Sequence, residues 1–126
     1  MPPPPARPPL TRSQLGALGE DIAVRYLTDH GLLVLDRNWR HARGELDVVA
    51  READALVFCE VKTRRGTGYG VPAEAVTAVK RRRLRTLSGL WLQAHEAHAA
   101  QLRFDVVAVL ALPGRPVQVT HHRAAF

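Results

Sequence analysis

Acidic side chains interrupt two apolar stretches of this sequence. Asp47 lies inside ELDVVAR (45–51), and Glu60 lies inside ALVFCEVKT (55–63), where Lys62 follows two residues later. Charges within strands that build a core are costly unless something pairs them. Hard cations such as Mg²⁺ take oxygen ligands, commonly one or two carboxylates together with phosphate and water. A lysine beside them can position an attacking water and offset the charge that develops on a phosphate.

A simpler explanation for these charges is a salt bridge between Lys62 and either acid, because an acid-x-lysine triplet is common in proteins. The choice of lysine favours the chemical explanation. Of the 18 basic residues only Lys62 and Lys80 are lysines, and the other 16 are arginines. An arginine cannot give up its proton and its guanidinium is wide, so a lysine here indicates that a compact ammonium group is needed.

Periodicity and turn residues predict the elements that must position these side chains. Apolar residues recur at helical spacing over 11–30, where Thr11 or Ser13 can cap the start and Gly31 follows the end. We expect strands at 32–39, 45–51, 55–63 and 103–112, a short fifth strand within 116–122, a loop at 64–72 and a long helix from about 73 to about 99.

Strands with apolar residues on both faces indicate a sheet that helices cover on each side. The sequence therefore predicts an α/β fold, a mixed sheet of four to five strands with helices on both faces, in a single domain over 11–126. Residues 1–10, MPPPPARPPL, are mostly proline and predict an extended, disordered arm.

Side chains alternate along a strand, which puts Glu60 and Lys62 on the same face. About four residues join the second and third strands, few enough for a hairpin. If Ala50 pairs with Ala55, Asp47 lies opposite Phe58 and is the diagonal neighbour of Glu60. A connection with an odd number of residues would flip that register and separate the two acids.

Glu20 is a third acid that could join this pair. It lies mid-helix in GALGEDIA, beside Gly16 and Gly19, and small residues let a helix approach a sheet closely. Its spacing alone is also that of an ordinary exposed helical glutamate.

The segment KRRRLR (80–85) holds five cations in six residues. Lys80 lies four residues before Leu84, on the packed edge of the helix, from where it can face the acids, and it is also predicted to contact the nucleic acid. Phosphate contacts are predicted for Arg81, Arg82 and Arg85, together with Arg64 and Arg65 beside the glycine loop. A solvated basic face is the alternative for this run. Tyr69 in the loop is either a substrate contact or a loop anchor.

Composition narrows the class of protein. The net charge of +6 and the pI near 10.7 favour a polyanionic partner such as nucleic acid. The single cysteine, Cys59, permits no disulfide within the chain and fits a core position in a reducing compartment. No stretch approaches the roughly 20 apolar residues of a membrane span, and the start lacks the apolar core of a signal peptide. We therefore expect a cytoplasmic protein without a membrane partner.

Two other kinds of site are not supported. Aromatic residues make up 6% of the chain, too few to predict a base-stacking platform. His95 and His98 lack a third ligand at zinc-like spacing.

Five stretches together resemble the YraN family, small bacterial proteins related to the Holliday-junction resolvases within the PD-(D/E)XK nuclease superfamily. They span nearly the whole chain beyond the arm, in the family's order. They are GALGEDIA (16–23), GELDVVA (44–50), LVFCEVKTR (56–64), GYGVPAEAV (68–76) followed by Lys80, and RFDVVAV (103–109).

The resemblance implies a restriction-endonuclease-like fold and assigns roles to the acids. Asp47 would be the first metal-binding acid, Glu60 and Lys62 the acid-x-lysine pair, and Glu20 the helical acid that completes the site. A nuclease that uses Mg²⁺ or Mn²⁺ to cut DNA, with branched or damaged duplex as the expected substrate, is the first interpretation. A nucleic-acid-binding accessory protein that does not cut is the alternative, and an RNA-directed role is a weaker one. A homodimer that makes paired cuts stays open.

Overall fold

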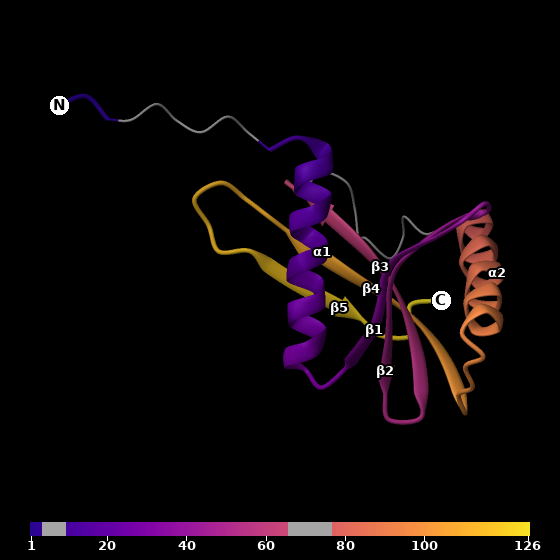
Figure 1. Cartoon of the computed structure of the whole chain (residues 1–126). Helices are drawn as coiled ribbons and strands as arrows, with labels where there is room; N and C mark the ends of the chain where they lie inside the picture. Colours follow the sequence, from indigo (N-terminus) through magenta and orange to yellow (C-terminus); the bar gives the residue numbers. More distant parts are fainter. Residues whose placement is uncertain (4–9, 66–76) are drawn as a thin grey trace.

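A computed structural model gives the structure of residues 1–3, 10–65 and 77–126 (Figure 1). Most of the predicted arm and most of the glycine loop, including Tyr69, lie outside these described residues. The order of elements is α1 (Arg12–Asp29), β1 (Leu33–His41), β2 (Gly44–Glu52), β3 (Ala55–Arg64), α2 (Ala78–Ala94), β4 (Gln101–Leu110) and β5 (Gln118–His122). The predicted order is confirmed, fifth strand included. No helix in the described ranges is long and apolar enough to cross a membrane.

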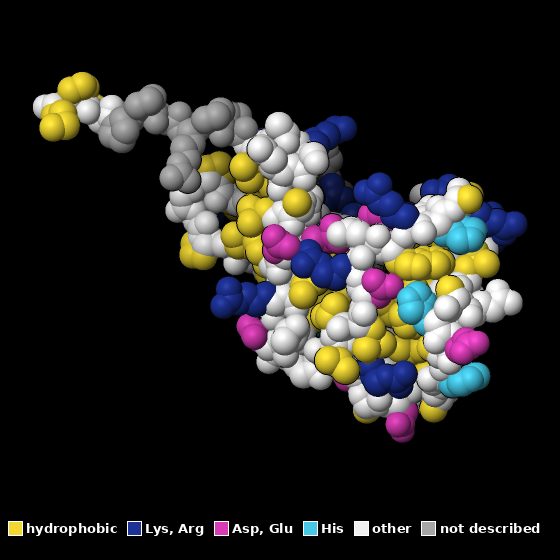
Figure 2. All heavy atoms as spheres, viewed as in Figure 1, with side chains coloured by type: hydrophobic (Ala, Val, Ile, Leu, Met, Phe, Trp, Pro, Cys, Tyr) yellow, Lys and Arg dark blue, Asp and Glu magenta, His cyan; other side chains and the backbone are white. Residues whose placement is uncertain are grey.

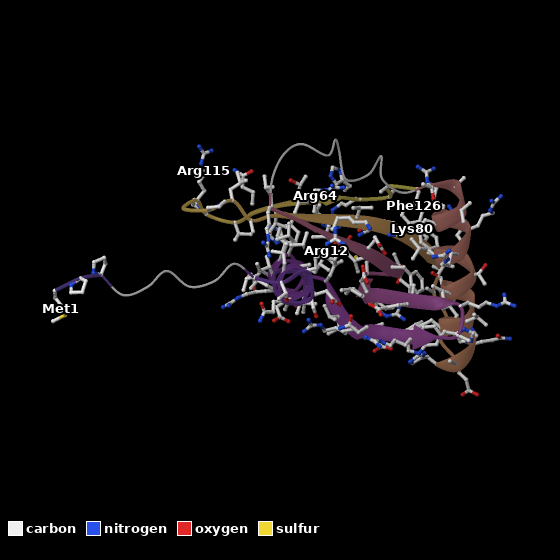
Figure 3. The ribbon with its side chains drawn as sticks, turned by 90° about the horizontal axis from the view of Figure 1, so that it is seen from above. Met1, Arg12, Arg64, Lys80, Arg115 and Phe126 are labelled. Carbon is white, nitrogen blue, oxygen red and sulfur yellow. The ribbon has the colours of Figure 1, made fainter. Side chains whose placement is uncertain are left out.

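The five strands form one mixed sheet in the order β1-β2-β3-β4-β5. β3 and β4 run parallel, joined by a crossover that contains α2, and the other neighbours run antiparallel. Seen from above, the two helices lie on opposite sides of the sheet (Figure 3). One core cluster, with Ala23, Leu27 and Val57, lies beneath α1, and a second, with Phe58, Leu87 and Trp91, lies beneath α2. The predicted mixed sheet with helices on both faces is confirmed.

α1 begins where the sequence predicts. Thr11 caps it, because its hydroxyl accepts a hydrogen bond from the amide of Gln14 at 3.1 Å while the Gln14 side chain accepts one from the Thr11 amide. The buried residues are Gly19, Ala23 and Leu27, whereas Leu18 remains 40% exposed. The helix thus meets the sheet through its small residues, and the larger apolar side chains flank the contact.

α2 is shorter than predicted. It begins at Ala78, because Thr77 is extended and its hydroxyl accepts a hydrogen bond from the amide of Lys80 at 3.2 Å. It ends at Ala94 instead of near residue 99. Leu84, Leu87 and Trp91, which recur at helical spacing in the sequence, are buried on its inner face.

The register of the β2–β3 hairpin differs from the predicted one. Glu52 pairs with Ala55 across a two-residue turn, in which Ala53 takes a φ of 50°. Ala50 consequently pairs with Val57 instead of Ala55. The shift is an even number of residues, so the side chains of the paired residues 48–52 keep their predicted faces. Phe58 pairs with Val49 instead of Asp47, and the recorded pairs of the hairpin end at Val48–Cys59, one residue before Asp47.

Candidate active site

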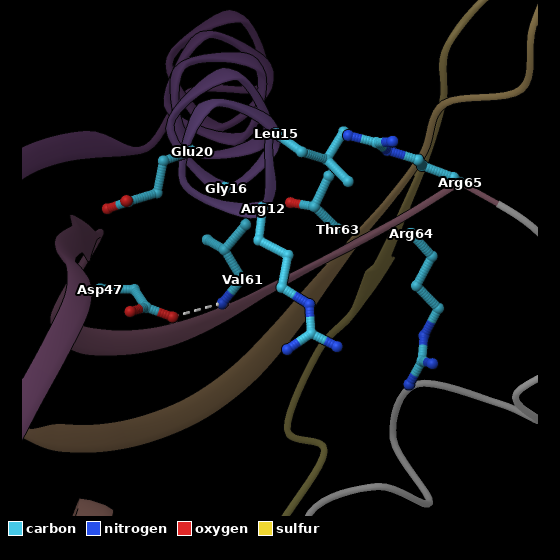
Figure 4. A pocket seen from close by; sticks show the side chains of 9 residues that line it. All are labelled: Arg12, Leu15, Gly16, Glu20, Asp47, Val61, Thr63, Arg64 and Arg65. Carbon is cyan, nitrogen blue, oxygen red and sulfur yellow. Dashed lines mark hydrogen bonds between the residues drawn. The ribbon is translucent and has the colours of Figure 1, made fainter. Parts of the chain in front are cut away.

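Asp47 lies where β2 separates from β3. The β2–β3 pairs run from Glu52–Ala55 to Val48–Cys59, whereas the β1–β2 pairs continue to His41–Gly44. Beyond Val48 the Asp47 side chain takes over the contact with β3, since its Oδ2 accepts a hydrogen bond from the backbone amide of Val61 at 2.9 Å (Figure 4). The carboxylate is thereby fixed in the gap between the two strands.

The surroundings of Asp47 disfavour its charge. Burial and then the neighbouring carboxylate of Glu60 raise its pKa from 3.8 to about 7, with Glu20 adding to the effect. The Val61 amide acts in the opposite direction. The charge of Asp47 in turn helps to raise the pKa of Lys80, but among the described residues this interaction does not offset burial and Glu60.

Glu60 has such partners. Its side chain is only 9% exposed, and its Oε1 lies 3.3 Å from Nζ of Lys62 and 2.5 Å from Nζ of Lys80. The salt bridge that the sequence left as an alternative is therefore present, and Lys80 joins it from α2. Lys80 faces the acids, as expected. Its contact with nucleic acid stays a prediction.

The two ammonium groups influence each other. Burial lowers the pKa of Lys62, and the adjacent Lys80 lowers it further, against the opposing effect of Glu60. Burial is the largest single influence on the pKa of Lys80 and lowers it, but the interactions with Glu60, Lys62 and Asp47 together outweigh burial, and the pKa is raised. Lys62 is thus the more easily deprotonated of the two.

Glu20 reaches this region because α1 lies so close to β3. A Cβ at Gly19 would overlap the side chain of Thr63, so only glycine permits the observed approach. Glu20 Oε1 is buried and has no hydrogen-bond partner among the described residues. Burial raises the pKa of Glu20, against the opposing charge of Arg37. The close packing suggested by the two glycines is confirmed at Gly19.

A pocket of about 850 Å³ lies between α1 and the end of the sheet (Figure 4). Glu20 and Asp47 line it, whereas Glu60 and Lys62 are not in its lining. Asp47 therefore belongs to two groups: it shares the pocket with Glu20 and interacts electrostatically with Glu60. The remaining lining residues are Arg12, Leu15, Gly16, Val61, Thr63, Arg64 and Arg65.

The donor set fits a hard divalent cation held by two carboxylates. Mg²⁺ is commonly bound by one or two carboxylates together with waters and substrate phosphate. Asp47 has a pKa raised by burial and by its acidic neighbours, and Glu20 has an oxygen without a partner among the described residues. Within the described ranges no three Asp, Glu, His or Cys side chains gather closely enough to hold an ion together. Glu60 does not join Glu20 and Asp47 in the pocket lining, and it is paired with Lys62 and Lys80 instead.

The basic run at the start of α2 spreads around the helix. The guanidinium of Arg85 lies 4.7 Å from the ring centre of Phe104, and that of Arg81 lies 5.8 Å from that of Phe126. Arg82 is exposed, and none of these three arginines is among the described residues that line the pocket. On the surface between α1 and α2, acidic and basic side chains meet (Figure 2).

Two features had no signal in the sequence. Arg12, the first residue of α1, lines the pocket although it is 35 residues from Asp47 in the chain. Asp105, on β4, is fully buried and receives two hydrogen bonds from Arg103 and one from the amide of Ala124, each at 2.9 Å. His121 lies 2.7 Å from it.

Although burial opposes it, contact with His121 and Arg103 lowers the pKa of Asp105 to about 2. This network ties the C-terminal segment to the sheet and is a structural one. An aspartate within a strand does not reveal such partners, because they come from other elements.

Comparisons with known proteins place the chain in a family. The model of the uncharacterised protein family UPF0102 matches residues 19–109. A UPF0102 protein of Rhodococcus opacus is 55% identical over 89% of this chain and 95% of its own length. Others are 50% identical in Nocardia farcinica, over 91% of each chain, and 54% identical in Mycobacterium bovis, over 89% of this chain and 91% of theirs.

Among solved structures, the Holliday junction resolvase Hjc of Archaeoglobus fulgidus is similar with a TM-score of 0.46 and 18% identity, over 83% of this chain and 75% of that one. The matched family region contains Glu20, Asp47, Glu60, Lys62 and Lys80. The chain belongs to the uncharacterised protein family UPF0102, the YraN family.

Proposed function

We propose that this protein is an endonuclease that uses Mg²⁺ or Mn²⁺ to hydrolyse phosphodiester bonds in DNA. The observation that carries the proposal is the position of Asp47, fixed in the gap between β2 and β3. Its carboxylate shares a pocket with Glu20 and lies close enough to Glu60 for that charge to help raise its pKa to about 7. Such a cluster of oxygens is unfavourable by itself and favourable around a cation.

The residues take distinct roles in this proposal. Asp47 and Glu20 hold the cation from β2 and α1, and Glu60 is the third acid assigned to it. The bound ion would supply positive charge to the phosphate and lower the pKa of a bound water. Lys62 Nζ orients the attacking water by a hydrogen bond, and its lowered pKa brings proton exchange at this atom closer to neutral pH. Lys80 holds Glu60 in place.

The charge of the protein supports DNA as the substrate. The net charge is +6, and Arg64 and Arg65 lie at the pocket that contains the acids. Arg81, Arg82 and Arg85 are proposed to contact the DNA backbone further away, along α2. Branched or damaged duplex is the proposed form of the substrate.

One observation favours a second function. Glu60 Oε1 is already paired with two lysines, and within the described ranges no set of three ligands is assembled. To bind a metal ion, Glu60 would have to separate from its lysines. A protein that only binds nucleic acid through the same surface would not need that separation. This non-catalytic binding function is the alternative.

A nuclease assay separates the two functions. The purified protein is incubated with Mg²⁺ or Mn²⁺ and with linear, nicked and four-way DNA. We expect a metal-dependent product that Asp47→Asn and Lys62→Met abolish. Glu45→Gln is the matched control, because Glu45 is an exposed acid two residues from Asp47 on the same strand and is predicted to keep activity. If no substrate gives a product that depends on both metal and Asp47, the binding function stands in place of the nuclease.

A further inference from the structure

The pocket has an acidic end and a basic end. Glu20 and Asp47 lie at one end, and Arg64 and Arg65 lie at the other, beyond the guanidinium of Arg12 in the view of Figure 4. These arginines come from two elements, the start of α1 and the end of β3 with the residue that follows it.

Arg12 does not serve to neutralise the acids. The strongest influences on the pKa of Asp47 are burial, Glu60 and the Val61 amide, and those on the pKa of Glu20 are burial and Arg37. Within the described ranges no ion pair joins Arg12 to an acid, and its side chain is exposed. Arg12 can therefore contact an anion that enters from solvent.

The burial of the acids restricts what can reach them. Glu20 Oε1 has almost no exposed surface and Asp47 is half-buried, so a phosphate must enter the pocket to meet their carboxylates. A volume of about 850 Å³ lies within the range of roughly 300–1,000 Å³ that holds a single small ligand. The major groove of duplex DNA is by itself about 12 Å wide. An intact duplex is therefore too thick to enter such a space together with the phosphate that meets the acids.

Among the described residues, the lining between the two ends offers no aromatic ring on which a base could stack. It consists of Leu15, Gly16, Val61 and Thr63, and no aromatic side chain is among the lining residues that the structure describes. Bases in single strands are held mainly by stacking on aromatic rings, whereas an arginine beside buried acids that a phosphate must reach is placed to bind the neighbouring phosphate. The pocket chemistry is thus suited to a sugar–phosphate backbone.

We propose that the pocket binds the backbone of one unpaired DNA strand without regard to sequence. One phosphate lies at Glu20 and Asp47, and a neighbouring phosphate of the same strand is held by Arg12 and Arg65. This inference rests on the proposed function, of which it names the substrate class: a strand that is unpaired at the point of attack, as in a flap or a branch.

Binding without cleavage tests the inference. Fluorescence anisotropy in EDTA compares a labelled oligothymidylate, a duplex with an unpaired flap and a blunt duplex hairpin. We expect the first two to bind more tightly than the third. Arg12→Ala is expected to weaken binding of the oligothymidylate about tenfold, equal to about 1.4 kcal/mol. It is also expected to lower the log–log salt slope by about 0.7, the value for one phosphate of a single strand.

Arg25→Ala is the matched control. Arg25 is an exposed arginine on the same helix, 13 residues away and hence about 20 Å along the axis. Charges at that distance are largely screened, so we expect Arg25→Ala to change the affinity for the oligothymidylate by less than about twofold. Arg12→Lys keeps the charge but loses the fork, and is expected to bind with intermediate affinity. Thermal melts of the three variants establish that each is folded.

The outcomes are distinct. Equal affinity for oligothymidylate and blunt duplex, or equal losses of affinity in Arg12→Ala and Arg25→Ala, would overturn the inference. A preference for unpaired strands that depends on Arg12, without cleavage of any substrate, would support the pocket and overturn the proposed nuclease. Cleavage with unchanged binding in Arg12→Ala would keep the nuclease and refute the strand-binding pocket.

Discussion

Nζ of Lys80 lies 2.5 Å from Oε1 of Glu60, the same oxygen that Lys62 approaches at 3.3 Å. The contact joins α2 to β3 across the face of the sheet opposite α1. It holds a carboxylate with 9% exposure in position, and it gives the second lysine of the chain a role that an arginine fork would fill poorly.

Removing Lys80 should destabilise the protein. Lys80→Met leaves Glu60 with Lys62 alone, and loss of a hydrogen bond between charged groups costs about 1.5–3 kcal/mol. Urea unfolding of the metal-free protein measures this change. Arg82→Met, an exposed cation on the same helix, should change stability by less than about 0.5 kcal/mol. Equal effects of the two substitutions would mean that the contact with Glu60 contributes nothing.

Asp47 should make the metal-free protein less stable as the pH rises. Its pKa is 3.8 as a free side chain and about 7 in the folded protein. Between these values the folded state binds more protons than the unfolded state, so the stability that Asp47 contributes is full below pH 4 and is lost by pH 7. Asp47→Asn should abolish this loss and stabilise the protein at about pH 8, by on the order of 2 kcal/mol.

Thermal melts of the wild type and Asp47→Asn from about pH 4 to about pH 8 measure the effect of Asp47. An asparagine can still accept the hydrogen bond from Val61, so that interaction is retained. A lower melting temperature for Asp47→Asn at the alkaline end of this range, without metal, would show that the acid is structural.

Divalent cations should stabilise the folded state through the acids. At about one hundred times its dissociation constant, Mg²⁺ should raise the free energy of unfolding of the wild type by about 2.7 kcal/mol. Asp47→Asn and Glu20→Gln should lose this response because each removes an oxygen ligand. Lys62→Met should keep it while losing cleavage, since Lys62 is assigned to the water. Melts with and without Mg²⁺ decide the matter, and an equal response of wild type and Asp47→Asn would remove the acids from the metal site.

The arginines of α2 should govern part of the salt dependence of binding. Arg81, Arg82 and Arg85 should each account for about 0.9 of the log–log salt slope on duplex DNA, provided that each binds one phosphate. The triple substitution to glutamine tests this by titration at several salt concentrations. Arg115→Gln, an exposed residue between β4 and β5, is the control. An unchanged slope in the triple variant would show that these arginines do not contact DNA. They would then be a solvated basic face, part of which packs on Phe104 and Phe126.

Gly19 should be the glycine that sets the distance between α1 and β3. Gly19→Ala places a methyl group against Thr63, and such overpacking costs about 1–3 kcal/mol. Gly89→Ala, on the exposed side of α2 with nothing within 4 Å of the new methyl group, should instead stabilise by about 0.5–1 kcal/mol. Urea unfolding of both variants measures these opposite signs. Stabilisation by both would show that α1 can move away at no cost.

The sequence determined what depends on short-range order. Alternation along 55–63 places Glu60 and Lys62 on one face, and the periodicity of 84–91 identifies the buried side of α2, both as observed. The order of elements and the cover of both sheet faces follow from the same patterns. These features are local because a side chain's direction within a strand or helix depends only on the neighbouring backbone.

The tertiary structure decided the rest. The hairpin register depends on the turn that Ala53 makes, and the separation of β2 from β3 lets a side chain replace a backbone partner. The contact of Lys80 with Glu60 and the entry of Arg12 into the pocket depend on how two helices dock on the sheet. Docking is set by close packing between residues far apart in the chain, such as Gly19 against Thr63. A single sequence carries no periodic signal for contacts of that kind.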